Sequence, residues 1–436
     1  MESTSKIFII CIMSMLSLKG YSQGCPTSGY PSFYSCSDIA QFVIDYPGCN
    51  RLPSTLRLPY GGVSNLAGFP GLAQLDSISG SLICDECDLS SLVGLENLNY
   101  VGGSVTIDEP HGTLVNLQGL NNLSYIGGGF NLYECSDLVS TNGLDNLLYI
   151  GDRIWLLDNT VLSQITGFEN ISHLPGQFWF DEMDAMIDLS GFDSLITIGG
   201  YVRIWDNALL NSLGGFNKIE LIGGYLDIAY NDMLIQLDAL DNLNTVGNDL
   251  HVRENETLDN IEGLSSLVNF NGEILVYQNS LLTNLDGIEN IAADSITNLI
   301  LGECDSLSIC SQPNICQYLI NSMGPSTINL NNSGCNSIPE ITAACAAIGV
   351  DEINLGEKFS IYPNPITDAT ILKSEIIKSG AIVHFYNYRG DLVKSVYGRD
   401  SNQILIDRTG LSEGLYLLRI VQDNEVIGAV KIVVII

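Results

Sequence analysis

The sequence predicts a mainly β protein in two parts, a parallel β-solenoid that fills most of the chain and a smaller antiparallel β domain at its C-terminal end. Three observations support this prediction. An apolar residue recurs every 24 residues, apolar residues alternate at fixed positions after it, and both patterns stop near Phe359, where lysines become frequent. A fixed period of this size is typical of a solenoid, in which each short repeat buries its core against its neighbours.

The repeat is clearest between Ile222 and Thr245, in the sequence IGGYLDIAYNDMLIQLDALDNLNT. We call the recurring apolar residue at its start the anchor. Anchors at the 24-residue spacing are Ile126, Ile150, Leu174, Ile198, Ile222, Val246 and Phe270. Earlier anchors, separated by 26, 23 and 25 residues from the next, are Leu52, Ile78 and Val101. Asp294 holds the following position but is polar, so the repeat is expected to weaken there.

Positions within each repeat are counted from the anchor. Alternating apolar residues at +4 and +6, such as Leu226 and Ile228, predict a strand whose +4 and +6 side chains point inward. Leucines at three-residue spacing follow and fill the rest of the coil. An asparagine recurs at +9, where a stacked side chain can satisfy the backbone groups of a corner. These residues are Asn159, Asn207, Asn231, Asn255 and Asn279.

Changes in composition and period divide the chain into six segments. They are a signal peptide (1–23), an N-terminal cap (24–70), the solenoid repeats (71–303), a cysteine-rich C-terminal cap (304–345), a linker (346–358) and the C-terminal domain (359–436). Apolar residues at helical spacing before Pro47-Gly48 predict a helix that closes the open end of the solenoid. In the C-terminal cap, ICQYLINSM predicts a short helix and STINLNNSGCN a last rung and turn.

The signal peptide is predicted from Lys6 and the apolar run from Ile7 to Leu18. A run of this length is too short to span a bilayer and is typical of a secretory signal. Cys25 follows the expected cleavage site directly, which raises a lipoprotein as an alternative. Ser22-Gln23-Gly24 is a poor lipobox, so we favour ordinary cleavage. No later stretch is long and apolar enough to predict a transmembrane segment.

Twelve cysteines are present, and eleven follow the signal peptide, so at least one is expected to be unpaired. Their clusters before and after the repeats indicate disulfide-stapled caps in a secreted chain. Cys87 and Cys135 share the +9 position two coils apart, about 9–10 Å by strand spacing, which is too far for a disulfide. We therefore expect Cys84 and Cys87 to bond locally or to remain as buried apolar fillers. Zinc is not expected, because no second pair has the ligand spacing of these two.

Charge restricts the classes of partner. The formal net charge is −33, and residues 25–350 carry 6 basic against 38 acidic side chains. Such a body repels nucleic acid and anionic membrane surfaces. The simplest interpretation of the excess acid is the solubility of an extracellular surface. Residues 351–436 are close to balance, with 9 basic and 11 acidic side chains, which separates them from the body.

The repeat pattern L-x-I-x-x-N-x-x-L-x-x-L-x-x-L-x-x-L-x-x-I-G-G covers roughly residues 50–345 and resembles leucine-rich repeats. It is even more similar to receptor L domains, the coils found in insulin-receptor-type ectodomains and in related bacterial surface proteins. The resemblance implies a right-handed coil. It also implies a binding role without indicating a ligand, because such coils do not share one.

From Phe359 the chain alternates like antiparallel strands joined by tight turns. It resembles the C-terminal sorting domain of the type IX secretion system. The matching residues are Pro363, Asn364 and Pro365, then Gly390 in the stretch RGDLV, then Gly414 and Tyr416, and finally Lys431 before the terminal IVV. The resemblance implies a small Ig-like β-sandwich that the outer-membrane translocon reads. It further implies a body that is released or attached to the surface of a Gram-negative bacterium; an ordinary adhesive β-sandwich is the alternative.

The odd positions of the predicted strands point outward and carry the candidate site. All three tryptophans of the protein, Trp155, Trp179 and Trp205, fall on this face. The other candidates are Tyr133, Arg203, Asp227, His251, Arg253 and Tyr277. Exposed aromatic groups on a rigid sheet are typical of binding surfaces. We expect Trp155 and Trp179 to be lateral neighbours, flat enough to stack on a sugar ring or a peptide side chain, with Arg203 able to pair with a carboxylate or sulfate.

These residues predict a secreted adhesion or ligand-binding protein whose partner is a glycan, a protein or another copy of the chain. The first alternative is purely structural, because aromatic ladders stabilise parallel sheets and arginine often lies over tryptophan. The second is a β-helical polysaccharide lyase or hydrolase using Arg203, Asp227, His251 and Arg253. Because Asp227 lies between Arg203 and His251, a salt-bridged ladder of the three is simpler. No nucleophile elbow, phosphate loop or metal motif occurs, so no catalysis, cofactor or metal is expected.

Overall fold

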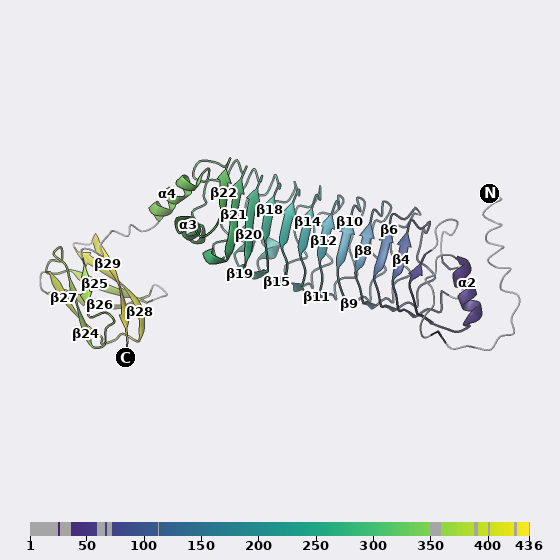
Figure 1. The fold of residues 1–436 in the computed structure, drawn as a ribbon, viewed down its shortest axis with the longest axis horizontal. Helices are drawn as coiled ribbons and strands as arrows, with labels where there is room; N and C mark the ends of the chain where they lie inside the picture. The colour runs from purple at the N-terminus through teal and green to yellow at the C-terminus, as the bar shows by residue number, and fades with distance from the viewer. Residues whose placement is uncertain are drawn as a thin grey trace. The chain divides into compact units, whose positions relative to one another are not determined.

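The computed structural model describes residues 25–26, 36–58, 66–67, 72–111, 113–348, 359–387, 391–399, 402–422 and 425–435. The predicted signal peptide, residues 349–358 of the predicted linker, and Gly390 lie outside this part of the chain. The chain forms two compact units, residues 1–345 and 346–436. Each unit is described by itself below, and Figure 1 shows the elements of both.

The first unit is a parallel β-solenoid, as predicted. Each coil adds one strand to a twelve-stranded parallel sheet, in which strands adjacent in space come from successive coils (Figure 1). The strands are β2 (Leu56–Arg57), β4 (Leu82–Asp85), β6 (Val105–Asp108), β8 (Phe130–Tyr133), β10 (Ile154–Leu157), β12 (Phe178–Asp181), β14 (Val202–Trp205), β16 (Leu226–Ala229), β18 (Leu250–Arg253), β20 (Gly272–Tyr277), β21 (Ile296–Gly302) and β22 (Ser326–Asn329). We call it the long sheet. Its register follows the sequence period, since Val202 pairs with Leu226.

Short strands that end on the anchors form two further parallel sheets of five strands each. The first contains β1 (Arg51–Leu52), β3 (Ser77–Ile78), β5 (Tyr100–Val101), β7 (Tyr125–Ile126) and β9 (Tyr149–Ile150). The second contains β11 (His173–Leu174), β13 (Thr197–Ile198), β15 (Leu221–Ile222), β17 (Thr245–Val246) and β19 (Asn269–Phe270). At the polar anchor Asp294 a 3-10 turn, η3 (Ala293–Ser295), replaces the short strand, while the long sheet continues. Two similar turns, η1 (Asp238–Leu240) and η2 (Glu262–Leu264), lie in the preceding coils.

The anchors and the +4 and +6 residues fill the core, as the alternation predicts. Ile222, Leu226 and Ile228 are at most 1% exposed. The expected N-terminal helix is α2 (Cys36–Asp45), which ends before Pro47. The C-terminal coils carry α3 (Pro313–Ile320) and α4 (Ile338–Ile348), so helix extends into the segment predicted as linker.

The asparagines at +9 form a buried ladder inside the corner of the coils. The Nδ2 of Asn231 donates to the carbonyl oxygens of Ile204 (3.0 Å) and Ala229 (2.9 Å), and its Oδ1 accepts from Nδ2 of Asn207 (2.8 Å). Asn255 makes the equivalent bonds one coil later. Asn231 and Asn255 are both 0% exposed. Because buried carbonyl groups need donors, these side chains have a structural role, as predicted.

The disulfides lie where the sequence predicts them, near both ends of the solenoid. The pairs are Cys25–Cys49, Cys84–Cys87, Cys310–Cys335 and Cys316–Cys345. Cys84 and Cys87 therefore bond locally, which is one of the two expected outcomes. Cys135 and Cys304 are free and buried. Each occupies the position of an asparagine in the ladder: the thiol of Cys135 contacts the carbonyl oxygen of Tyr133 at 3.3 Å.

The second unit is built from two antiparallel sheets. One contains β23 (Ser360–Tyr362), β24 (Ala369–Lys373) and β27 (Gln403–Asp407); the other contains β25 (Ile382–Tyr386), β26 (Leu392–Tyr397), β28 (Gly414–Gln422) and β29 (Glu425–Val434). Side chains from both sheets meet in one apolar core that includes Leu372, Phe385 and Ile432. Among the helices of the described residues, none has the combination of length and apolar character required to cross a bilayer.

Candidate functional site

The predicted site residues lie on the outer face of the long sheet, on β8 to β20. Their lateral order matches the prediction, because Trp155 pairs with Trp179, Trp179 with Arg203, and Arg203 with Asp227. Most of these outward side chains are half-buried by their neighbours. Asp227 is the most buried of them, at 5% exposure, because the Arg253 side chain covers it on the outer face. We call Trp179, Arg203 and Trp205 with Asp227 and Arg253 the Arg–Trp cluster.

The tryptophans do not form the flat platform that the sequence suggests. The rings of Trp155 and Trp179 have centroids 5.6 Å apart but planes inclined at 80°. Tyr133 meets Trp155 at 61° with centroids 6.5 Å apart. Edge-to-face packing of this kind is the preferred geometry of neighbouring aromatic rings, because the positive edge of one ring faces the negative face of the other. A sugar ring therefore cannot stack on Trp155 and Trp179 together.

Arginine side chains cover the faces of the tryptophan rings. The Arg203 guanidinium carbon lies 3.6 Å from the ring centroid of Trp205 and 4.9 Å from that of Trp179. Arg253 lies 4.4 Å from the same Trp205 ring. Further along the sheet, Arg153 lies 3.7 Å from the ring centroid of Trp155. These distances are within the range of cation–π attraction, so the aromatic and basic residues of this face act as one unit.

The expected ladder of Arg203, Asp227 and His251 is wrong in its ion pairs, although its register is correct. Asp227 instead accepts two hydrogen bonds from Arg253, from Nε to Oδ1 at 3.2 Å and from Nη2 to Oδ2 at 3.0 Å. Nε2 of His251 lies 3.2 Å from Oε1 of Glu273, but it has no hydrogen-bond partner among the described residues. The extended Arg253 side chain reaches back over the adjacent strand, and this bidentate geometry is the one that guanidinium and carboxylate prefer.

Among the described residues, Arg203 consequently has no acidic partner. Of the six basic side chains in residues 25–350, three form ion pairs: Arg57 with Asp85, Arg153 with Asp152, and Arg253 with Asp227. The three that form none among the described residues are Arg51, Arg203 and Lys218. In a body with 38 acidic residues, a half-buried arginine without a carboxylate is unusual. Its Nε is also buried without a hydrogen-bond partner in the described structure.

A half-buried carboxylate and a buried indole N–H complete this part of the face. Asp181 accepts a hydrogen bond from Nε1 of Trp179 at 2.9 Å. Burial raises the pKa of Asp181, although the Trp179 hydrogen bond and the charge of Arg203 oppose the shift. Nε1 of Trp155 is buried and finds no partner among the described atoms. Such unsatisfied donors are uncommon in structural positions and require an explanation.

At the two ends of the face the tyrosines have different surroundings. Tyr133 is half-buried, and burial raises the pKa of its hydroxyl. Tyr277 donates a hydrogen bond from its hydroxyl to Oε1 of Glu303, which raises the pKa of Tyr277. Tyr277 therefore belongs to a separate polar contact that does not include the Arg–Trp cluster.

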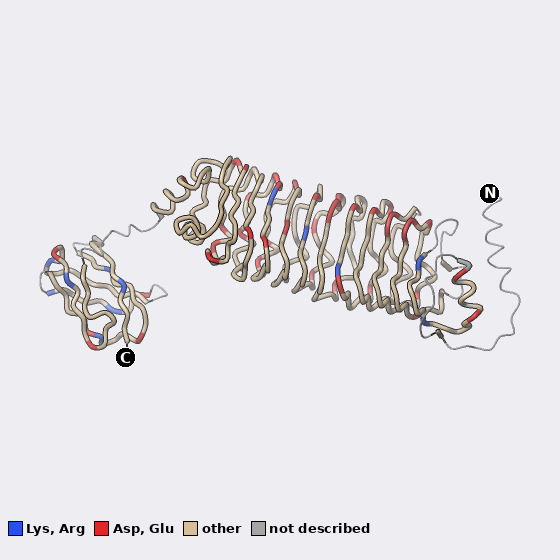
Figure 2. The backbone as a smooth tube through the Cα atoms, viewed as in Figure 1, with Lys and Arg blue, Asp and Glu red and all other residues tan. Residues whose placement is uncertain are grey.

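An acidic edge follows the long sheet and was not predicted from the sequence. At +8 of nine successive coils a residue that is not glycine adopts the left-handed conformation, with φ between 39° and 58°. These residues are Glu86, Glu109, Glu134, Asp158, Glu182, Asp206, Tyr230, Glu254 and Gln278. Figure 2 shows acidic residues recurring along the coils and few basic ones. A hollow of about 650 Å³ at this edge is lined by Asp232, Glu254 and Glu303 among others.

We expect this edge to make the solenoid more stable at mildly acidic pH. Burial, and then the charges of neighbouring carboxylates, raise the pKa of Glu182 and Asp206. A carboxyl with a raised folded-state pKa contributes stability below its unfolded pKa and loses it as the pH rises through the folded value. The melting temperature should therefore rise as the pH falls from 7.5 to 4.0, by only about 1 °C because solvent screens these exposed carboxylates. Thermal unfolding followed by circular dichroism would measure this change. Replacing Glu182 with Gln and Asp206 with Asn should make the melting temperature depend less on pH. A melting temperature that falls as the pH is lowered over this range would contradict the prediction.

The described residues contain no group of three or more His, Cys, Asp or Glu side chains arranged to hold a metal ion.

The sorting motif of the second unit joins its first turn to its last strand. Asn364, between two cis peptide bonds, accepts a hydrogen bond from the backbone N–H of Val433 (2.9 Å) and donates to the carbonyl oxygen of Lys431 (3.3 Å). Gly414, with φ of 148°, begins β28, and Tyr416 donates from its hydroxyl to the carbonyl oxygen of Ser412 at 2.9 Å. Two of the sequence motifs, separated by nearly 70 residues, thus form one local structure.

The two units define the class of protein: a disulfide-capped parallel β-solenoid followed by an antiparallel β domain with a motif closed by its own C-terminal strand. Residues 360–435 match the family described as the secretion system C-terminal sorting domain. This domain is a type IX sorting signal, so the protein is secreted and attached to the cell surface, as the sequence predicts. No curated protein matches the chain.

Proposed function

We propose that the solenoid is a binding module displayed on the cell surface. In this proposal the Arg–Trp cluster recognises a partner that carries a carboxylate or sulfate, on a glycan or on a protein. The observation that carries the proposal is the environment of Arg203, which lies between two tryptophan rings without an acidic partner among the described residues. A guanidinium held by stacking is pre-organised to receive a planar anion through two hydrogen bonds.

The unsatisfied donors of the face support binding over a purely structural role. A ladder that only stabilised the sheet would leave no reason for buried Nε of Arg203 and Nε1 of Trp155 to lack partners. Arg153 and Arg253 illustrate the structural alternative, because each stacks on a tryptophan and also bonds a side-chain oxygen of the sheet. Arg203 differs from both in this respect.

The same contacts favour binding over catalysis. A lyase on this face would need a free base near the group that neutralises a substrate carboxylate. Asp227 is held by two hydrogen bonds from Arg253, and the buried Nε2 of His251 lies 3.2 Å from the Glu273 carboxylate, so neither is an open base. We therefore propose a binding protein without enzymatic activity, which predicts that polygalacturonate incubated with it yields no unsaturated product.

Replacing Arg203 with Met should weaken binding of an anionic ligand at least tenfold, because a charge-assisted hydrogen-bond pair to a desolvated anion contributes about 1.5–3 kcal/mol. The probes are sulfated heparin oligosaccharides and oligogalacturonates, titrated calorimetrically into the mature chain. Arg153→Met is the matched control: it removes a cation stacked on a tryptophan whose guanidinium already bonds Asn131 and Asp152, and should change the affinity less than threefold. Equal losses in both variants would indicate general charge attraction and contradict the proposal.

A further inference from the structure

A second site is formed by a different sheet, the first of the short-strand sheets. Its outward residues, one per coil, are Arg51, Ser77, Tyr100, Tyr125 and Tyr149, aligned in register. The three tyrosines form a continuous stack, with ring centroids 4.8 and 4.7 Å apart and planes inclined by 8° and 14°. The stack stops at Tyr100, because the next coil carries a serine. One ring face of Tyr100 is therefore not covered by another ring.

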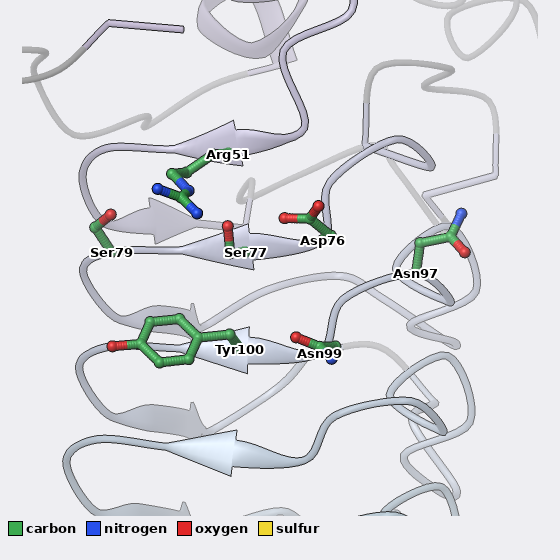
Figure 3. A pocket seen from close by; sticks show the side chains of 7 residues that line it. All are labelled: Arg51, Asp76, Ser77, Ser79, Asn97, Asn99 and Tyr100. Carbon is green, nitrogen blue, oxygen red and sulfur yellow. The ribbon is translucent and has the colours of Figure 1, made fainter.

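The serine leaves one layer of the stack vacant. Parallel strands are about 4.8 Å apart, so Arg51 and Tyr100, two coils apart, are separated by about 9.6 Å at the backbone. Ser77 lies on the strand between them, and its small side chain fills little of this distance. The resulting cavity has a volume of about 620 Å³ and is lined by Arg51, Asp76, Ser77, Ser79, Asn99 and Tyr100 among others (Figure 3). A cavity of this size is within the range of small-ligand sites.

The floor of the cavity carries an unsatisfied hydroxyl. Ser77 is 8% exposed, and its Oγ forms no hydrogen bond with any described atom. A buried hydroxyl without a hydrogen-bond partner destabilises the folded protein by about 1–3 kcal/mol, so such groups are rare unless a ligand or a water molecule bonds to them. Ser77 lies between the Tyr100 ring and the Arg51 side chain in Figure 3. The unsatisfied hydroxyl therefore belongs to a residue that lines the cavity, in the layer between Arg51 and Tyr100.

The rim of the cavity is polar. Asp76 is held by a hydrogen bond from Nδ2 of Asn50, and its carbonyl oxygen accepts from the backbone N–H of Asn99 at 2.9 Å. Asn99 is exposed, and no side-chain hydrogen bond fixes its amide group within the described structure. Arg51 is exposed and forms no ion pair there. Donors and acceptors therefore surround a space that is bounded on one side by an aromatic face.

We propose that this cavity, the tyrosine slot, binds one pyranose ring of a glycan, stacked on Tyr100 as the next layer of the tyrosine ladder. A pyranose presents C–H groups on its face and hydroxyls around its edge. The C–H groups suit the negative face of an aromatic ring. The hydroxyls, as donors and acceptors, suit Ser77, Asp76 and Asn99, and Arg51 adds donors from the opposite side. The proposal goes beyond the proposed function and is independent of it, because it concerns another sheet and other residues.

A pyranose fits the slot better than the aromatic side chain of a peptide. A phenyl or indole ring would also stack on Tyr100. It would, however, exclude water from Ser77 and from the polar rim without replacing those hydrogen bonds, at a cost of about 1–3 kcal/mol for each buried group. The polar edge of the cavity therefore selects a ring with hydroxyl groups.

The test is an array of neutral and uronic-acid oligosaccharides, probed with the mature chain, followed by calorimetry with the best-bound oligosaccharide. Ser77→Tyr should reduce the affinity at least tenfold, because a fourth ring would fill the vacant layer. Tyr100→Leu should do the same, because it removes the stacking face. The matched controls are Tyr149→Leu, which shortens the far end of the same ladder, and Leu221→Tyr, which adds a ring at the equivalent position of another coil. Both should bind within twofold of the wild type.

The following outcomes of these experiments would overturn the proposal. No oligosaccharide bound on the array would remove its basis. An affinity retained in Tyr100→Leu would place the ligand elsewhere, and an equal loss in Tyr149→Leu would indicate an open tyrosine surface instead of a slot. Preferential binding of tyrosine- or tryptophan-containing peptides would replace the glycan by a protein partner. Loss of binding in Arg203→Met with none in Tyr100→Leu would support the Arg–Trp cluster alone, so the two proposals fail separately.

Discussion

Replacing Asn231 with alanine should lower the free energy of unfolding of the solenoid by about 3–5 kcal/mol. The side chain is fully buried and donates to the carbonyl oxygens of Ile204 and Ala229, while it accepts from Asn207. Alanine would leave these groups without partners, and each buried unsatisfied group costs about 1–3 kcal/mol. Urea unfolding followed by circular dichroism and tryptophan fluorescence would measure the change.

Asn211→Ala is the matched control for this prediction. Asn211 is exposed on the preceding coil, so its replacement should change the free energy of unfolding by no more than about 0.5 kcal/mol. If both variants unfolded at the same urea concentration as the wild type, the asparagine ladder would not be part of the scaffold. Because repeat arrays can unfold in stages, the two optical signals should be compared before a single free energy is assigned.

Deleting residues 425–436 should reduce the amount of protein on the cell surface at least tenfold. These residues contain β29, which pairs with β28 along its whole length and buries Ile432 and Val434 in the core of the sorting domain. The deletion also removes both hydrogen-bond partners of Asn364. A sheet that loses its longest strand exposes its core and cannot present a folded signal to the translocon. Protease treatment of intact cells that carry the type IX machinery, with fractionation, would measure surface display.

The control for export is Arg203→Met, which alters the body and leaves the sorting domain unchanged. It should reach the surface at the wild-type level. Surface display of the deletion variant at that level would contradict the assignment of residues 360–435 as the export signal.

Much of the fold is predictable because the period and the alternation have direct physical causes. The anchors, the +4 and +6 residues and the asparagines must occur at fixed positions if every coil is to bury its core and satisfy its corner. Not every coil has an asparagine at +9: Met183, Cys87 and Cys135 hold this position in other coils and are equally buried, so the ladder tolerates other members. The sorting domain was identifiable for another reason, namely the order and spacing of its motifs.

The contacts of the candidate site were less predictable. The register placed Asp227 beside Arg203 and His251, and this placement is correct. Long side chains, however, choose partners by reach and geometry as well as by register, so Arg253 extends back to Asp227. Ring orientation is likewise decided by quadrupole attraction between neighbours, which a repeat pattern does not encode. The perpendicular arrangement of Trp155 and Trp179 follows from that.

The acidic edge and the tyrosine slot were missed for two different reasons. A left-handed backbone conformation is usually expected at glycine or asparagine. The glutamates and aspartates at +8 therefore did not predict this conformation. The signal was nevertheless present as a column of acid at one position of the repeat. The slot exists because one coil carries a serine at the position where the next three coils carry tyrosine. It can be found in the sequence only by comparing the residue before each anchor from coil to coil.

The central claim, that the outer face of the long sheet binds a ligand, is tested most directly by acrylamide quenching of tryptophan fluorescence. All three tryptophans of the protein lie on this face, so the emission reports on it alone, and binding at the tyrosine slot leaves it unchanged. With saturating sulfated or uronic-acid oligosaccharide, identified by calorimetry, the quenching constant should fall to half or less of its ligand-free value, because the ligand shields Trp179 and Trp205. A ligand that binds calorimetrically while the quenching constant stays the same would contradict the claim.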